Sequence, residues 1–194
     1  MNNDKAKDNW FGDWAAEYDE TIGKVERHHN LLDLVVESSY VKKYDNILDI
    51  GCGTGLLALK FLQKSNCHIT GVDSSQEMLD VFKGKINNFG LNEKIVYKHE
   101  DLENMDFGEK QFDIISSTFT LHHIKDKHTM IEKIYKMLKI GGRLIIGEID
   151  LDTTGDVMDT KRLMRIMDYL KIEFSLALHE GGVNAFSRMY DNGK

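Results

Sequence analysis

The residues with the clearest chemical potential form a glycine-rich bend. The sequence ILDIGCGTG, residues 47–55, runs from buried-strand character directly into Gly51, Gly53 and Gly55. Because glycine has no Cβ, the backbone can adopt positive φ and a ligand can lie against the main chain where the next helix begins. A dinucleotide fingerprint would have its third glycine at position 56, which is Leu56 here. Such a bend can also be only a structural turn, so other residues must identify its ligand.

Two acidic residues follow the ends of later predicted strands. Asp73 closes the run HITGVD, about 20 residues beyond the bend, where a carboxylate can accept hydrogen bonds from both hydroxyls of a ribose. Its alternative role is to cap the helix that begins near Ser74. Asp101 lies in HEDLENMDF, residues 99–107, where it could accept from an adenine amine beside an apolar Leu102, or could be a solvated charge. The bend and Asp73 together predict an adenosyl or nucleotide ligand.

These groups need a scaffold that brings strand ends together. Strand-like runs are found at residues 46–50, 68–73, 94–100, 112–118 and 143–149, and helical periodicity at 56–64, 74–90 and 127–139. This alternation predicts right-handed crossovers and a parallel sheet covered on both faces, with ligands outside the carboxyl ends of its strands. Residues 10–40 and 156–178 also have helical spacing. The predicted fold class is α/β, a Rossmann-like doubly wound sheet, mostly parallel, in a three-layer αβα arrangement.

The bulk composition argues against several classes of protein. A net charge of −7 and the lack of basic clusters interleaved with aromatics argue against nucleic acid as a partner. No apolar run approaches the roughly 20 residues that span a bilayer, and residues 1–14 carry no export signal, so we expect no membrane partner and a cytoplasmic location. Cys52 and Cys67 form no CxxC pair, so both are interpreted as reduced thiols and no metal site is expected.

Taken together, the motifs resemble those of a known family, the class I S-adenosylmethionine-dependent methyltransferases, in the small-molecule branch with a methyltransferase 11/25 type domain. The matching segments are WFGDWAAEYD (10–19), ILDIGCGTG (47–55), GVDSSQEML (71–79), EDLENMDF (100–107), FDIISSTFTLHHI (112–124) and LKIGGRLIIGEID (138–150). The resemblance implies a single domain over residues 1–194. It would comprise an N-terminal helical lid (1–42), a cofactor-binding core (43–150) and a C-terminal helical segment (151–194).

The resemblance also implies the cofactor, S-adenosylmethionine, with S-adenosylhomocysteine as product. The methionine part would lie over the three glycines of the bend, with its ammonium near the Gly51 carbonyl. Asp73 would bind the ribose hydroxyls, and Met78 would flank the adenine. The implied cofactor-binding residues are Gly51, Cys52, Gly53, Gly55, Asp73, Ser74, Met78, Asp101, Leu102 and, near the transferring methyl, Thr118.

Catalysis of this kind needs few chemical groups. A sulfonium methyl is already activated, so in-line displacement depends on alignment and exclusion of water, without a metal or a covalent nucleophile. A general base is needed only if the acceptor must lose a proton, and the candidates are His122 and His123 after the fourth strand. The alternative is that both histidines only pack that loop. Glu148, which ends the fifth strand, could orient a polar acceptor.

The N-terminal segment offers one further candidate. The resemblance implies that Tyr18 faces the methionine end of the cofactor, whereas Tyr18, Trp10 and Trp14 could instead only cover an apolar helix face. For His28 and His29 we favour a solvated helix face. The predicted catalytic residues are therefore His122, His123 and Tyr18.

The end of the chain departs from the family pattern. The family sheet has seven strands and ends in an antiparallel pair, but the sequence predicts only five strands, as in a truncated or naturally short form. An exposed fifth strand would need to be covered by the C-terminal helix or by a second subunit, and we hypothesise a homodimer there.

Three functions remain to be compared. The loop SSTFT, residues 116–120, lacks the Asn/Asp-Pro-Pro-aromatic run of methyltransferases that act on base or amide nitrogens, which favours a small-molecule acceptor. A non-catalytic or regulatory S-adenosylmethionine-binding protein is the main alternative. A nicotinamide-dependent oxidoreductase is disfavoured by Leu56 and by the same loop.

Overall fold

The computed structural model describes residues 15–149, 174–179 and 184–186. The strands are β1 (Asn46–Ile50), β2 (His68–Asp73), β3 (Ile95–His99), β4 (Phe112–Thr118), β5 (Leu138–Ile149), β6 (Phe174–His179) and β7 (Asn184–Phe186). The helices are α2 (Glu26–Ser39), α3 (Leu56–Lys64), α4 (Gln76–Asn88) and α5 (Lys127–Met137), with short 3-10 helices η1 (Ile22–Lys24) and η2 (Leu121–His123). Within these ranges, no helix has the length and hydropathy of a bilayer-spanning segment.

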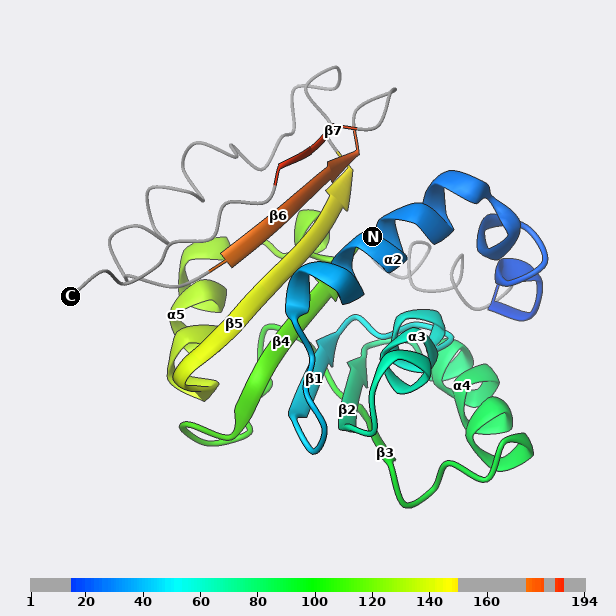
Figure 1. The fold of residues 1–194 in the computed structure, drawn as a ribbon, viewed down its shortest axis with the longest axis horizontal. Helices are drawn as coiled ribbons and strands as arrows, with labels where there is room; N and C mark the ends of the chain where they lie inside the picture. The colour runs from blue at the N-terminus through cyan, green and yellow to red at the C-terminus, as the bar shows by residue number, and fades with distance from the viewer. Residues whose placement is uncertain (1–14, 150–173, 180–183, 187–194) are drawn as a thin grey trace, which may run out of the picture.

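A seven-stranded sheet in the order β3-β2-β1-β4-β5-β6-β7 forms the centre of the molecule (Figure 1). All strands from β3 to β6 pair in parallel, and β7 is antiparallel to β6. The chain starts the sheet at β1, extends it through β2 to β3, and then returns to add β4 on the other side of β1. The topological switch point, where open α/β sheets bind ligands, therefore lies between the carboxyl ends of β1 and β4.

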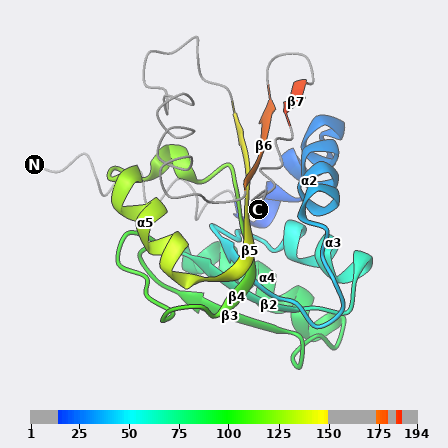
Figure 2. The same cartoon turned by 60° about the vertical axis from the view of Figure 1, so that its left-hand side comes forward.

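Helices cover both faces of the sheet, as predicted. Figure 2 shows α5 on one face, with α2 and α3 on the other. Alternate residues of β1 explain this: Leu48 and Ile50 belong to the core cluster beneath α5, whereas Ile47 belongs to the cluster beneath α2, α3 and α4. A strand buried on both sides must be apolar along its length, which is why ILDI is nearly continuous in hydrophobicity. The predicted Rossmann-like α/β fold class is confirmed.

The expectation of only five strands is wrong. β6 pairs with β5 from Leu144↔Phe174 to Ile149↔His179, and β7 continues the sheet beyond it. Residues 174–178 were predicted as part of a helix over 156–178, of which the remainder lies outside the described residues. Short apolar runs such as FSLALH fit a strand or a buried helix equally well by periodicity, and pairing with β5 decides between them. Because β6 covers β5, the reason for proposing a homodimer at that strand disappears.

The bounds of two helices also differ from the prediction, since α4 covers Gln76–Asn88 instead of 74–90 and α5 ends earlier than expected. The N-cap of α4 is Ser75 rather than Ser74: the Ser75 hydroxyl accepts from the backbone N–H of Met78 at 3.2 Å. Helix α5 ends at Met137 instead of continuing to residue 139, because Leu138 already pairs with Phe112 of β4.

Candidate functional site

The predicted functional residues gather along one side of the sheet. The glycine bend follows β1, Asp73 ends β2, Asp101 comes shortly after β3, Thr118 ends β4, and Glu148 lies near the end of β5. Because these strands are parallel, their carboxyl ends meet at one edge, which we call the carboxyl edge. The fold thus brings together residues that are far apart in sequence, as the strand pattern predicted.

The three glycines of the bend have different surroundings. All have positive φ: 71° at Gly51, 52° at Gly53 and 82° at Gly55. A Cβ on Gly51 would lie 2.0 Å from Oγ1 of Thr120, and one on Gly55 would lie 2.0 Å from the Phe82 ring. A Cβ on Gly53 would have no atom within 4 Å. Gly51 and Gly55 are therefore required by internal packing, and Gly53 is the glycine that leaves the main chain open to a ligand.

Asp73 is joined directly to this open position. Its Oδ2 accepts from the Gly53 N–H at 2.7 Å, and its Oδ1 accepts from the Ser75 N–H at 2.9 Å. Burial raises the pKa of the carboxyl, and hydrogen bonding from the backbone of Ser75, Gly53 and Ser74 opposes that shift. Each oxygen keeps a further lone pair, so the carboxylate can still accept from two neighbouring hydroxyls. The geometry fits a ribose diol, and the helix-cap alternative is wrong because Ser75 is the cap.

The residues implied to hold the adenine differ in burial. Met78 and Leu102 are both buried, with 5% and 7% exposure. Asp101 is exposed, and its two oxygens accept from the Glu103 N–H at 2.9 Å and from the Asn104 side chain at 2.8 Å. These bonds fix the loop and leave the carboxylate with spare lone pairs toward solvent. An apolar wall beside an exposed acceptor suits the edge of an adenine ring.

The remaining residues implied to bind the cofactor, Cys52, Ser74 and Thr118, differ in burial. The Cys52 thiol is buried against Gly71, and burial raises its pKa well above the ordinary value, so the side chain packs within the core. Ser74 is exposed, and its carbonyl oxygen lies 2.9 Å from Nε2 of His99. Thr118 is half-buried, and its carbonyl accepts from the Thr120 hydroxyl at 2.8 Å.

Asp49 is a buried carboxyl that the sequence analysis missed. It lies on β1, is 1% exposed, and accepts from the Ser116 hydroxyl at 3.0 Å. Among the described residues its Oδ2 has no hydrogen-bond partner. Burial raises the pKa of Asp49 to about 7, with Ser116 opposing and Asp73 adding to the shift. An unpaired acceptor just before the bend fits a ligand with a positive group. The signal in the sequence was a single acid inside the apolar run ILDI.

We expect the Asp49 carboxyl to make stability depend on pH. Its folded-state pKa exceeds the value of about 3.9 for an unfolded aspartate, so the folded state holds the proton more tightly and its contribution to stability falls as pH rises from about 4 to about 7. Asp49→Asn should remove that dependence, worth up to about 4 kcal/mol for a shift of three pKa units. Urea unfolding of both proteins at pH 4.5 and 8 measures it.

The difference between wild type and Asp49→Asn is the relevant quantity in that experiment. His28, whose pKa is lowered to about 4, changes stability in the opposite direction over the same range and cancels in the difference. An equal difference in unfolding free energy at the two pH values would contradict the assignment.

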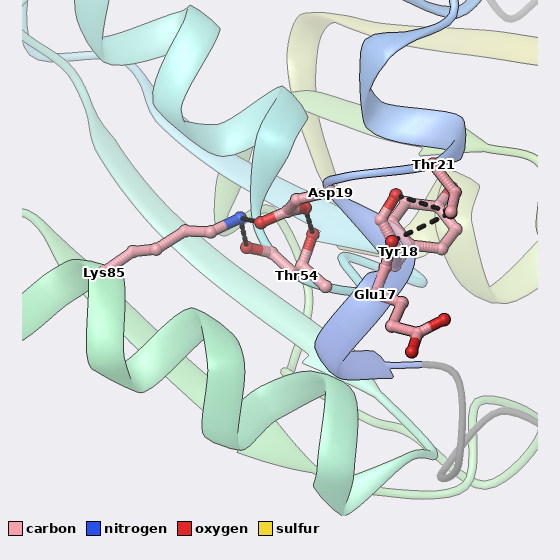
Figure 3. A network of polar contacts seen from close by, with 6 residues as sticks. All are labelled: Glu17, Tyr18, Asp19, Thr21, Thr54 and Lys85. Carbon is pink, nitrogen blue, oxygen red and sulfur yellow. Dashed lines mark hydrogen bonds and ion pairs between the residues drawn. The ribbon is translucent and has the colours of Figure 1, made fainter.

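The N-terminal segment is fastened to the bend by a polar network (Figure 3). Oδ1 of Asp19 accepts from the Thr54 hydroxyl at 2.7 Å, and Oδ2 lies 2.5 Å from Nζ of Lys85. Lys85, on α4, also donates to the Thr54 carbonyl at 2.8 Å. Asp19, Thr54 and Lys85 thus join three separate parts of the chain beside the glycines. None of the three was predicted as a site residue.

Disrupting this network is expected to speed loss of the cofactor product that the resemblance implies. If residues 15–24 cover the ligand, Lys85→Met removes the ammonium but keeps the apolar stem, so the segment opens more often. We expect dissociation of S-adenosylhomocysteine to become about 3- to 10-fold faster, since 1.4 kcal/mol is a factor of ten. Stopped-flow fluorescence measures this rate. Lys83→Met, on the exposed side of the same helix, is the matched control, and equal rates in both variants would contradict the role.

Tyr18 and His28 pack against each other beneath this segment. Their ring centroids are 6.1 Å apart in an edge-on arrangement, and Phe119 lies 5.3 Å from His28. Burial, followed by the charges of Asp19 and Asp73, raises the pKa of Tyr18 to about 12, so its phenol stays protonated and suits hydrogen bonding better than proton removal. His28 is 5% exposed, so the predicted solvated position is wrong for this residue. Trp10 and Trp14 lie outside the described residues.

His122 and His123 differ although they are adjacent. Nδ1 of His122 lies 2.8 Å from Oε1 of Glu148, and its ring centroid is 3.9 Å from that of the exposed His123. Glu148 is therefore a partner of His122, rather than only the acceptor-orienting group that the sequence suggested.

The fold and the residues at the carboxyl edge together define a class of protein. A parallel sheet with an open glycine bend and a strand-end carboxylate at its switch point is a Rossmann-like α/β protein of the kind that binds nucleotides there. Residues 47–142 match a family model described as a methyltransferase domain. The chain belongs to the class I S-adenosylmethionine-dependent methyltransferases.

Similar proteins support this assignment. The chain is 33% identical over 154 residues to the ubiquinone biosynthesis O-methyltransferase of Coxiella burnetii, covering 77% of this chain and 64% of that protein. It is 30% identical over 167 residues to the demethylmenaquinone methyltransferase of Bacteroides fragilis, covering 80% and 65%. A crystal structure from Methanococcus maripaludis, assigned as an S-adenosylmethionine-dependent methyltransferase, has the same fold, with a TM-score of 0.73, 18% identity and coverage of 100% and 98%. The chain thus spans about two thirds of the length of these curated relatives.

Proposed function

We propose that this protein transfers a methyl group from S-adenosylmethionine to a small-molecule acceptor by in-line displacement. The observation that carries the proposal is the hydrogen bond, 2.7 Å long, between the open Gly53 and Asp73 at the carboxyl edge. It joins an unshielded stretch of main chain to a carboxylate with spare acceptors, the two features that an amino-acid tail and a ribose require.

The chain's own residues would bind and orient the cofactor, which supplies the activated sulfonium methyl when bound. Gly53 would lie under the methionine part, and Asp73 would accept from the ribose. Met78, Leu102 and Asp101 would hold the adenine, and Thr118 would lie toward the methyl. Residues 1–42 would serve as a lid on a core of 43–150, with 151–194 completing the domain.

The acceptor is proposed to be a small organic molecule. The relatives named above are, by their names, a ubiquinone biosynthesis O-methyltransferase and a demethylmenaquinone methyltransferase, which supports such an acceptor over nucleic acid or protein. The main alternative, a non-catalytic S-adenosylmethionine-binding protein, is favoured by no observation at the carboxyl edge. We also retain the prediction of a cytoplasmic location.

Calorimetry and a turnover assay test this proposal together. The protein should bind S-adenosylmethionine and S-adenosylhomocysteine, with NAD binding far more weakly, and should release S-adenosylhomocysteine in the presence of some member of a metabolite panel. Absence of affinity for both adenosyl compounds would refute the proposal. Binding without turnover on the panel would favour the non-catalytic alternative.

A further inference from the structure

A second surface of the molecule lies at the end of the sheet opposite the carboxyl edge. Because β1 to β5 are parallel, the segments that lead into them also meet at one edge, along the lower side of Figure 1. Backbone hydrogen bonds join neighbouring segments: the Tyr44 N–H donates to the Asn66 carbonyl at 2.8 Å, and the Lys110 N–H donates to the Lys136 carbonyl at 2.9 Å. We call this surface the amino edge, and it comprises residues 37–46, 64–68, 89–94, 109–113 and 135–143.

The amino edge is positively charged although the protein is acidic, with a net charge of −7. It has eight Lys and Arg residues against five Asp and Glu, whereas the rest of residues 15–149 has nine against sixteen. Two of its acids are already engaged: Asp45 accepts from the Lys42 N–H at 2.8 Å, and Asp113 lies 2.7 Å from Nζ of Lys139. Five lysines of the amino edge are exposed: Lys42, Lys43, Lys64, Lys110 and Lys136.

The same edge carries most of the exposed large apolar side chains. Seven are found among the described residues, and five of these lie at the amino edge. Ile140 is 93% exposed, because the pairing of β5 with β4 passes from Leu138↔Phe112 to Arg143↔Ile114 and the four residues between bulge outward. The other four are Tyr40, Tyr44, Phe89 and Tyr135. Exposed apolar groups gathered in one place, among lysines, are typical of a contact surface.

We propose that the amino edge docks on an anionic phospholipid surface, with its lysines at the headgroup phosphates and Ile140 inserted among the headgroups. Basic residues near such a surface are attracted to it, and tyrosine rings are favoured at the boundary between headgroups and acyl chains. Ile140 makes lipid a better occupant than nucleic acid, because an aliphatic side chain has no ring to stack on a base.

The distribution of the charges also favours lipid over a protein partner. The lysines belong to separate segments rather than to the rim of one groove, and a fluid lipid layer can rearrange to meet each of them. The expectation of no membrane partner rested on the lack of a bilayer-spanning run, which a peripheral contact does not need.

The acidic remainder of the protein does not prevent this contact. Strands β1 and β4 have five and seven residues, so the two edges of the sheet are about 17–23 Å apart at about 3.3 Å per residue. This separation exceeds the Debye length of about 8 Å at physiological ionic strength, so the acids of the carboxyl edge are screened from the lipid. The carboxyl edge then faces water, and docking leaves it open to ligands.

Sedimentation of the whole protein with lipid vesicles tests the charge. The protein should bind phosphatidylcholine vesicles that contain about 30% phosphatidylglycerol, and not pure phosphatidylcholine, and about 1 M salt should release it. Lys43→Gln combined with Lys110→Gln should lower the partition coefficient about 10- to 30-fold, since each lysine near the surface contributes about a factor of five. Lys98→Gln combined with Lys125→Gln removes the same charge outside the amino edge and is the matched control.

Ile140 tests whether the contact is with lipid or only with negative charge. Ile140→Ser should lower the partition coefficient about 3- to 10-fold, because the inserted apolar surface is lost. An environment-sensitive fluorophore on Ile140→Cys should shift its emission to shorter wavelength with the anionic vesicles, whereas one on Lys125→Cys should not. Both positions are exposed, so the fold should be retained.

Four outcomes would overturn the inference. They are equal binding to both kinds of vesicle, an equal loss in the control pair, full binding by Ile140→Ser, and self-association in light scattering without vesicles that Ile140→Ser abolishes. The last of these would assign the amino edge to a second copy of this chain. The result is independent of the proposed function, because calorimetry with S-adenosylhomocysteine should give the same affinity for the wild type and for the Lys43/Lys110 variant.

Discussion

Replacing Asp73 with asparagine is expected to weaken binding of S-adenosylmethionine by about 100-fold or more. The carboxylate already accepts from the backbone N–H groups of Gly53 and Ser75, one on each oxygen. An asparagine has one acceptor oxygen, so one of these donors would lose its partner, at a cost of about 1–3 kcal/mol. The ribose would also lose at least one charge-assisted hydrogen bond, worth about 1.5–3 kcal/mol. Since 1.4 kcal/mol is a factor of ten, the sum of about 2.5–6 kcal/mol corresponds to about two to four orders of magnitude.

Calorimetric titration with S-adenosylhomocysteine measures this loss. Asp80→Asn is the matched control, because Asp80 is exposed on α4 and accepts only from the Gln76 side chain among the described residues. Its affinity should equal that of the wild type. Thermal unfolding of both variants shows whether the fold is retained, and unchanged affinity in a folded Asp73→Asn would remove the ribose assignment.

Alanine at Gly55 is expected to destabilise the fold by about 2–5 kcal/mol. Its φ of 82° is a left-handed conformation, which costs a residue with a Cβ about 1–2 kcal/mol. The new Cβ would also lie 2.0 Å from the Phe82 ring, which is fully buried, and overpacking of this kind costs about 1–3 kcal/mol. Urea unfolding at constant pH measures the change.

Gly53→Ala makes the comparison informative, because φ is also positive there but no atom is near. We expect the Gly53→Ala variant to remain folded and to lose only about 1–2 kcal/mol of unfolding free energy, which is the cost of placing a residue with a Cβ in the left-handed conformation. Its methyl group would nevertheless occupy the space proposed for the ligand, so affinity for S-adenosylhomocysteine should fall at least 10-fold. If Gly53→Ala binds as tightly as the wild type, the open main chain is not the ligand surface.

The pattern of the bend could not distinguish these glycines. All three occupy equivalent positions in GCGTG, and the sequence assigned the same role to each. Their difference arises from Thr120 and Phe82, which come from other elements and fill the space beside Gly51 and Gly55. Only the packing of those side chains leaves Gly53 as the open position.

The sequence by itself determined the local elements and their order. The bounds of β1, β2, β4 and α3 agree with the patterns read from the chain, because alternation, helical period and turn residues are properties of a few neighbouring positions. The location of the glycine bend and of Asp73 at strand ends follows from the same signals. So does the parallel sheet, since helices between strands allow little else.

Tertiary structure alone decided which residues became hydrogen-bond partners. Thr54 reaches Asp19 across 35 positions, His122 reaches Glu148 across 26, and Ser116 reaches Asp49 across 67. The same long-range packing buries His28 and Asp49 and adds β6 and β7 to the sheet. A residue's type and its neighbours limit which contacts it can make, but burial and hydrogen-bond partners depend on which distant segment lies against it once the core has closed.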